Sequence, residues 1–251
     1  MEPSQAEALV TQSEEDDVQF TGTVEVDQPA YLRSNVTLEC TVNTGYKSVI
    51  EPNMTSVTGP DIVRFTATVT VPSATSSLLV GNVIVKTSVK APLLAPVIAS
   101  TSAVVVADQY FSARLEFEEF AFIRLGKGES DQVELVIYND GNGQDTFVVS
   151  LEEVPPGLRA SLQQSQVVVQ QRESGSVVID VTVDQDSDGG THKIVVKVTS
   201  SESQGDYSRT EPLLVHVQTL REDLKVPGLP VPLVLVSICL AAAILRERRR
   251  G

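Results

Sequence analysis

The sequence predicts an all-β fold of two tandem Ig-like β-sandwich domains, followed by one C-terminal transmembrane helix. Three observations indicate this architecture. The chain is rich in Thr, Val and Ser and has no Trp, a composition that favours strands over long amphipathic helices. Apolar and polar residues alternate with period two along much of the chain. The C-terminal residues 226–251 form an uncharged apolar run that closes with four arginines and one glutamate.

Before the first strand we expect residues 1–17 to be a disordered acidic lead-in, because four carboxylates follow one another at 14–17. This start has neither the basic region nor the apolar region of a secretory signal peptide. Either a leader is absent from the sequence, or the protein is tail-anchored with its body in the cytosol. The arginine tail favours the first interpretation.

Residues 18–108 are predicted to form the first sandwich, of about five to seven short antiparallel strands. Period two is clear in five segments: 18–26, 36–42, 64–71, 83–89 and 97–106. Cys40 shares the inward parity of Val36, so we interpret it as a small core residue and not as a reactive thiol. The only other cysteine, Cys239, lies in the apolar run, so no disulfide is expected within the two sandwiches.

Residues 109–219 are predicted to form the second sandwich. Strands are expected at seven places: 110–117, 133–138, 146–151, 167–169, 177–183, 193–199 and 213–218. Residues 139–145, rich in Asn, Asp and Gly, are predicted to be a hairpin loop with residues at positive φ. Residues 155–158, Pro-Pro-Gly-Leu, predict another turn. Residues 220–225 are expected to form a juxtamembrane linker.

The segment 133–199 resembles the Ig-like domain associated with α-galactosidases, which recurs in archaeal and bacterial surface proteins. The likeness rests on four elements: Asn139-Asp140-Gly141-Asn142 with Asp145-Thr146-Phe147, Pro155-Pro156-Gly157-Leu158, Glu173-Ser174-Gly175-Ser176, and Gly190 with His192. That family more commonly has tyrosine at the position of His192, and tryptophan often follows the Pro-Gly turn, where this chain has Leu158 and Arg159. The resemblance implies an Ig-like fold over about 110–219 and a prokaryotic, archaeal-type surface protein.

Residues 226–245 are predicted to cross a lipid bilayer as a helix, and residues 246–251 to form a cytoplasmic tail. The stretch 229–245 spans about 25 Å at ~1.5 Å per residue, and flanking arginines can reach the head groups. A buried core helix or strand is the alternative. Basic residues resist translocation, so the body is expected outside the cell. The residues that set this topology are Arg246, Arg248, Arg249 and Arg250.

The Pro227-Gly228-Leu229 sequence before the apolar run resembles the C-terminal sorting signals of archaeal surface proteins, which typically carry Pro-Gly-Phe. Because leucine stands in the phenylalanine position, processing by a sorting enzyme is not predicted. The chain has a net charge of −14, and without the tail of four arginines and one glutamate (net +3) the body carries −14 − 3 = −17. Nucleic acid and anionic lipid head groups are therefore not expected as partners of the body, since both would be repelled.

One segment imitates the opening of a calcium-binding loop, with carboxylates at Asp184, Asp186 and Asp188. The twelfth position is Val195 and not the expected glutamate, so we favour an acidic hairpin turn and predict no metal or other cofactor. The same holds for the Asn and Asp residues of 139–145. Asn35 and Asn53 begin N-glycosylation sequons, which matter only if the body is exported.

The sequence does not predict an enzyme. Its two histidines, His192 and His216, do not pair by spacing with a nucleophile or a second metal ligand. The carboxylates are scattered, and no pattern isolates an acid–base pair.

We therefore expect a non-catalytic, membrane-anchored cell-surface protein that presents Ig-like domains for envelope structure, adhesion or protein–protein interaction. Its partners would be envelope proteins, a second copy of the chain or extracellular polymer. One alternative is an extracellular glycan-binding module, for which Tyr31 and Tyr46 would provide aromatic surfaces. A second alternative is a tail-anchored accessory subunit with a cytosolic body.

Overall fold

The computed structural model describes residues 1–119 and 121–218, and these form seventeen strands without a helix. In residues 1–119 and 121–218, no helix is long and apolar enough to cross a lipid bilayer. The predicted linker, membrane span and arginine tail, at 220–225, 226–245 and 246–251, lie outside the described residues. The described part of the chain is all-β, as predicted.

The first sandwich packs a five-stranded sheet, in the order β1-β8-β7-β3-β5, against a three-stranded sheet, in the order β2-β6-β4. Its strands are β1 (Gln5–Ala8), β2 (Asp16–Val26), β3 (Arg33–Val42), β4 (Lys47–Glu51), β5 (Met54–Thr58), β6 (Asp61–Val71), β7 (Val80–Lys90) and β8 (Val97–Ala107). Neighbouring strands are antiparallel except β1, which runs parallel to β8. Phe20 and Leu38 are among the largest fully buried side chains.

The second sandwich packs the sheet β10-β17-β16-β12-β14 against the sheet β13-β15-β11-β9. Its strands are β9 (Ala113–Phe117), β10 (Phe122–Gly126), β11 (Ser130–Asn139), β12 (Asp145–Glu152), β13 (Leu158–Leu162), β14 (Gln166–Val169), β15 (Ser174–Val183), β16 (Gly190–Ser200) and β17 (Ser208–Gln218). Here too an early strand, β10, pairs in parallel with the last one, β17. Phe147 and Leu135 lie in its core.

The two cores are separate, since one ends at Ala107 and the other begins at Ala113. In β6 the alternating Phe65, Ala67 and Val69 are all buried, because successive side chains of a strand point to opposite faces. Each fully buried valine or phenylalanine contributes about 1.5–3 kcal/mol to folding. The alternation of apolar residues therefore both places the strands and stabilises them.

The prediction of a disordered lead-in is wrong for residues 1–17. Residues 5–8 form β1, which pairs with β8 from Gln5 opposite Val104 to Ala8 opposite Ala107. Ala8 and Val10 are buried in the first core, and β2 already begins at Asp16. This segment is ordered because Ala8 and Val10 are buried and the backbone of β1 pairs with β8. The acidic side chains do not prevent this, since they can point to solvent.

Both predicted hairpins, at 139–145 and 184–189, are connections between the two sheets of the second sandwich. The first joins β11 to β12 and the second joins β15 to β16, and in each case the two strands belong to different sheets. None of the residues 139–145 adopts a positive φ. By contrast, Gly157 has φ +81°, and the next residue, Leu158, donates its N–H to the carbonyl oxygen of Pro155. Residues 155–158 therefore form the predicted turn.

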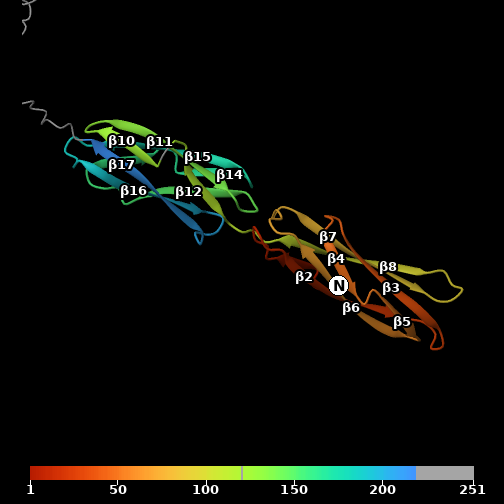
Figure 1. The fold of residues 1–251 in the computed structure, drawn as a ribbon. Coiled ribbons are helices and arrows are strands. Elements are labelled where there is room, and N and C mark those ends of the chain that lie inside the picture. The colour runs from red at the N-terminus through yellow and green to blue at the C-terminus, as the bar shows by residue number, and fades with distance from the viewer. Residues whose placement is uncertain (120, 219–251) are drawn as a thin grey trace, which may run out of the picture.

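Figure 1 shows the two sandwiches end to end. The loop between β11 and β12, residues 140–144, contacts the first sandwich at the loop between β6 and β7, residues 72–79, where the Ser77 N–H donates to the carbonyl oxygen of Asn142. We call this contact the junction. The hairpin loop between β7 and β8 lies at the opposite end of the first sandwich, which we call the far end. The C-terminal end of β17 lies at the end of the second sandwich that is remote from the junction.

Candidate functional site

The junction is centred on Asn142, whose side chain is fully buried between the two sandwiches. Its amide nitrogen donates to the carbonyl oxygens of Thr75, at 2.9 Å, and Asp108, at 2.8 Å. Its amide oxygen accepts the N–H of Tyr110 at 2.8 Å, and its own carbonyl oxygen accepts the N–H of Ser77 at 2.9 Å. Both amide hydrogens and the amide oxygen are thus bonded, so burial of this polar group costs little.

Two glycines let the loop approach the first sandwich and the linker closely. A Cβ atom on Gly141 would lie 2.7 Å from the carbonyl oxygen of Tyr110, and one on Gly143 would lie 2.6 Å from the Ser77 hydroxyl. Both distances are too short for a carbon atom. Glycine is needed here for space, whereas the sequence had suggested positive φ angles.

The loop is held from within the second sandwich by Asn139, which is buried at the end of β11. Its amide nitrogen donates to the carbonyl oxygens of Gly143, at 2.8 Å, and Val169, at 3.0 Å, and its amide oxygen accepts the N–H of Gly141 at 3.0 Å. The loop is therefore tied to β14 before Asn142 enters the junction. A loop fixed in this way is pre-organised for docking.

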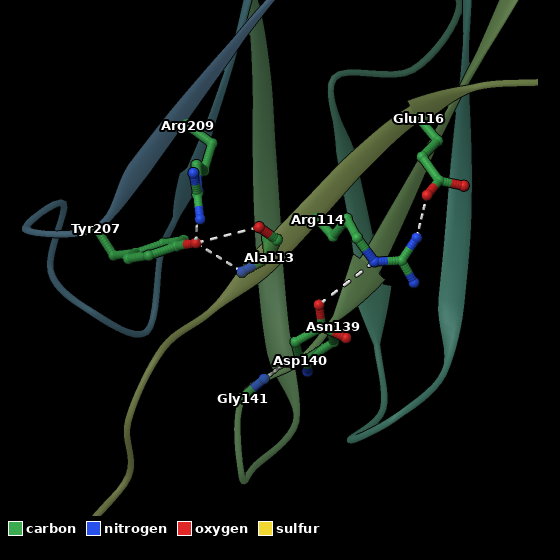
Figure 2. A network of polar contacts seen from close by, with 8 residues as sticks. All are labelled: Ala113, Arg114, Glu116, Asn139, Asp140, Gly141, Tyr207 and Arg209. Atoms are coloured by element: carbon green, nitrogen blue, oxygen red, sulfur yellow. Dashed lines mark hydrogen bonds and ion pairs between the residues drawn. The ribbon is translucent and has the colours of Figure 1, made fainter. Parts of the chain in front are cut away.

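The side chain of Tyr207 holds the start of β9 (Figure 2). The Tyr207 hydroxyl accepts the N–H of Ala113 at 2.6 Å, donates to the carbonyl oxygen of the same residue at 3.3 Å, and lies 3.3 Å from Arg209 Nε. The neighbouring Arg114 stacks on Tyr138, 3.9 Å from the ring centre, and approaches Asp140 at 3.7 Å. These contacts connect the first strand of the second sandwich to the junction loop.

Asp145 is the first residue of β12, directly after the β11–β12 loop, and is almost completely buried. One carboxylate oxygen accepts the Ser200 hydroxyl at 2.9 Å, and the other, Oδ2, has no hydrogen-bond partner among the described residues. Burial raises the pKa of Asp145 above its usual value, and the hydrogen bond from Ser200 opposes the shift. The charged form is therefore costly in the folded protein.

The far end of the first sandwich carries an apolar hollow of about 430 Å³. Two stretches of the chain line it: residues 25–34, from the end of β2 to the start of β3, and residues 89–97, from the end of β7 to the start of β8. The most apolar of the lining residues are Val26, Pro29, Leu32, Val89, Leu94 and Val97. Tyr31 and Leu93, in the same two loops, are exposed. Exposed apolar side chains that cluster in this way are typical of an interaction surface.

The floor of this hollow is ordered by Gln28. Its amide nitrogen donates to the carbonyl oxygens of Leu32, at 3.1 Å, and Gly59, at 2.9 Å, and its amide oxygen accepts the hydroxyl of the buried Ser34. Gly59 adopts φ +76° in the turn between β5 and β6. The loop at 27–32 is thus fixed to the neighbouring turn, which gives the far end a defined shape.

The acidic segment 184–188 does not assemble into a metal site. The Asp184 carboxylate pairs with Arg159 at 2.9 Å, the intervening Ser187 is buried, and Asp186 and Asp188 are exposed. Residues 1–119 and 121–218 contain no group of three or more His, Cys, Asp or Glu side chains placed to hold an ion. At 139–145, the Asn139 and Asn142 amides bind backbone groups instead of an ion.

The two histidines lie on neighbouring strands, β16 and β17, but on opposite faces of the sheet. His192 shares the parity of the buried Ile194, whereas His216 alternates with the buried Val215 and Val217. His192 bonds to the carbonyl oxygen of Asp188 at 2.9 Å and His216 to the Thr191 hydroxyl at 3.0 Å. The structure does not bring the two imidazoles together.

The other predicted site residues are scattered over the first sandwich. Tyr31 is 87 % exposed, but Tyr46 packs against the core with its hydroxyl buried, so the two tyrosines do not form one aromatic platform. The sequon residues Asn35 and Asn53 are both exposed. Cys40 is half-buried against the core, and burial raises the pKa of its thiol. The topology residues Arg246, Arg248, Arg249 and Arg250 lie outside the described residues.

No protein-family model and no curated protein matches the sequence. Among solved structures, mouse cadherin-23 domains EC22–24 are similar with a TM-score of 0.50 and 8% identity, over 87% of this chain and 64% of that one. The protocadherin gammaB4 extracellular domain has a TM-score of 0.45 and 10% identity, over 88% of this chain and 32% of that one.

A protein of unknown function from Porphyromonas gingivalis W83 has a TM-score of 0.31 and 12% identity, over 87% of this chain and 98% of that one. At such identities the likeness to cadherin-23 concerns the fold alone. The chain shares with those domains an all-β architecture of consecutive sandwiches. The resemblance to the Ig-like domain associated with α-galactosidases stays a prediction.

Proposed function

We propose that this protein is a non-catalytic, membrane-anchored cell-surface protein, in which two sandwiches act as one spacer and present the far end for interaction. The junction carries the proposal. Asn142 donates amide hydrogen bonds to Thr75 and Asp108, and its carbonyl oxygen accepts the Ser77 N–H, so three hydrogen bonds and no charge of this residue join the sandwiches. A polar group that is buried and fully bonded resists separation, because parting the surfaces would break all of these bonds together.

The two ends of this spacer differ in the way that the proposed function requires. The last strand of the second sandwich ends at Gln218, and the sequence continues through residues 219–225 to the apolar run and the arginines. The far end of the first sandwich carries the apolar hollow and the exposed Tyr31 and Leu93. Anchored through 226–245, the chain would hold this surface away from the bilayer, with the arginine tail in the cytoplasm.

Partners of the far end would be envelope proteins, extracellular polymer or a second copy of the chain. A glycan is disfavoured, because Tyr46 is packed into the core and Tyr31 alone offers no extended platform. The exposed Asn35 and Asn53 are compatible with glycosylation of an exported body.

Protease treatment of intact native cells tests the orientation. One epitope is inserted after Leu93, at the far end, and a second is added after Gly251. We expect loss of the first epitope without lysis, while the second stays protected until the cells are opened. Protection of both epitopes would instead favour a cytosolic body, as in a tail-anchored accessory subunit, and would overturn the proposal.

A further inference from the structure

The first half of β8 leaves one edge of the first sandwich open. β1 pairs with β8 only from Val104 onward, so the first half of β8 has β7 on one side and no strand on the other among the described residues. Residues 97–102 are all exposed. Unpaired backbone groups along such an edge form a template for another strand.

The direction of these backbone groups follows from β1. Val104 donates its N–H to the carbonyl oxygen of Ser4 at 3.0 Å, away from β7. Because the backbone groups of an extended strand alternate in direction, those of Ile98, Ser100 and Ser102 point to the same open side. Three residues thus offer N–H and C=O groups to a partner strand.

The chemistry of the edge favours a second copy of the chain. Residues 91–107 contain no charged side chain, in a protein with a net charge of −14. Two copies therefore meet at this edge with the least repulsion, since like charges placed directly opposite would oppose pairing. The hydrophobic Val97 and Ile98 are 70% and 57% exposed, and pairing would cover both.

Other sheet edges of the described residues are poorer templates. Seven edge strands, β1, β4, β5, β9, β10, β13 and β14, have at most five residues each. The remaining edge strand, β2, is long but carries Asp16, Asp17 and Glu25. Short or charged edges are the usual protection against strand pairing, whereas the open part of β8, residues 97–102, is longer than each of the seven short strands and carries no charge.

We propose that two copies of this chain pair through β8, antiparallel and with a two-fold axis at Ser100. Each Ser100 exchanges both backbone hydrogen bonds with its equivalent, and each Ile98 exchanges them with Ser102 of the other copy. A closed two-fold contact uses the same residues on both sides. Parallel pairing is excluded for this edge, because facing residues of a parallel ladder must be offset by one, which would break the symmetry.

Antiparallel pairing has a geometric consequence for the complete molecule. β8 runs from the far end toward the junction, so the second sandwiches of the two copies extend in opposite directions. The pair therefore links two facing surfaces and not two neighbours on one surface. This linking role rests on the proposed anchoring, whereas the pairing itself does not.

Site-directed crosslinking of the detergent-solubilised full chain tests the pairing without reference to a membrane. In a background with Cys40→Ser and Cys239→Ser, Ser100→Cys is compared with Thr101→Cys under mild oxidation. We expect a covalent dimer for Ser100→Cys, since the axis places the two copies of this residue opposite each other. Thr101 faces Ala99 of the partner, so its cysteine variant should give at least tenfold less dimer. Equal crosslinking at both positions, or none at Ser100→Cys, would overturn the proposal.

Liposomes that contain the full chain test the linking of surfaces. We expect them to aggregate, and we expect Ser100→Pro to abolish aggregation because it removes the central N–H from the edge. Ser100→Ala keeps that N–H and should aggregate as the original does. An unchanged melting temperature of Ser100→Pro shows that the fold is intact. Aggregation by Ser100→Pro would contradict the pairing, whereas failure of the chain to float with liposomes would contradict only the anchoring.

Discussion

The amide nitrogen of Asn142, in the second sandwich, lies 2.9 Å from the carbonyl oxygen of Thr75, in the first sandwich. This bond, with the one to Asp108, places a buried side chain of one domain against the backbone of the other. An interface between consecutive domains is commonly flexible unless it is large and apolar. Here three hydrogen bonds of Asn142, to Thr75, Ser77 and Asp108, join the two domains.

Asn142→Ala is expected to uncouple the sandwiches while both remain folded. The substitution leaves the Thr75 and Asp108 carbonyls and the Tyr110 N–H without their partner, at a cost of about 1–3 kcal/mol to docking. Spin labels at Glu39→Cys and Ser150→Cys, in a chain without Cys40 and Cys239, report the distance between the sandwiches. The distance distribution should become clearly broader in the variant.

Asn43→Ala is the matched control for this experiment. Its amide oxygen accepts the N–H of Asn82 at 2.7 Å, but both residues belong to the first sandwich. We expect the same distance distribution as in the original chain. A distribution that stays narrow in Asn142→Ala would show that other contacts hold the junction.

The two glycines of the junction should differ in their sensitivity to alanine. In Gly141→Ala the new methyl group meets the backbone carbonyl of Tyr110, whereas in Gly143→Ala it meets the ends of the Ser77 and Gln109 side chains. Side chains can turn away more easily than backbone. Overpacking of this kind costs about 1–3 kcal/mol, and we expect Gly141→Ala to lie at the upper end in urea denaturation. A larger loss for Gly143→Ala would contradict this order.

Tyr207→Phe is expected to destabilise the second sandwich by about 1–2 kcal/mol. It removes the hydroxyl that accepts the Ala113 N–H at 2.6 Å. Tyr31→Phe is the control, because Tyr31 is 87% exposed, and its unfolding midpoint should not change. Equal midpoints for both variants would mean that the Tyr207 hydroxyl contributes nothing to stability.

Asp145 should make stability depend on pH. Its folded-state pKa is raised, chiefly by burial, so the folded protein binds a proton at a higher pH than the unfolded chain does. The free energy of unfolding therefore falls as pH rises from the unfolded pKa, about 3.9, to the raised folded pKa. Relative to Asp145→Asn, the original chain should be most stable below about pH 4 and should lose that advantage as pH increases.

Ser200→Ala sharpens this test. It removes a hydrogen bond that favours the charged carboxylate, so the loss of stability should extend to higher pH than in the original chain. Urea denaturation at a series of pH values gives both profiles. An advantage over Asp145→Asn that grows with pH would show that the carboxylate is stabilised and not penalised.

Sequence alone predicted the strands whose alternation is regular. β6 is the clearest case, because Phe65, Ala67, Val69 and Val71 all turn to the core. β1 could not be predicted, since Ala8 is its one buried residue and its pairing partner, β8, is about a hundred residues away in sequence. Of β4, only Ile50 is buried, so its pattern is equally weak.

The junction could not be derived from sequence, although its residues were singled out. The sequence predicts Asn142 and Gly141 only as turn formers, because Asn and Gly are the usual residues of turns. Their real role depends on Thr75 and Ser77, which belong to the other sandwich and are brought close only by the complete fold. The hollow at the far end has the same origin, since two segments that are far apart in sequence, 25–34 and 89–97, line it.

The central claim is that an anchored spacer holds the far end away from the membrane. Energy transfer to an acceptor in the lipid tests it directly, with the full chain in liposomes and a donor dye at one of two exposed positions. Asp186→Cys labels the end of the second sandwich near Gln218, because Gly190 pairs with Val217, and Leu93→Cys labels the far end. Both variants carry Cys40→Ser and Cys239→Ser. We predict strong transfer from position 186 and weak transfer from position 93. Equal transfer from both positions would mean that the sandwiches lie along the membrane, and would contradict the account.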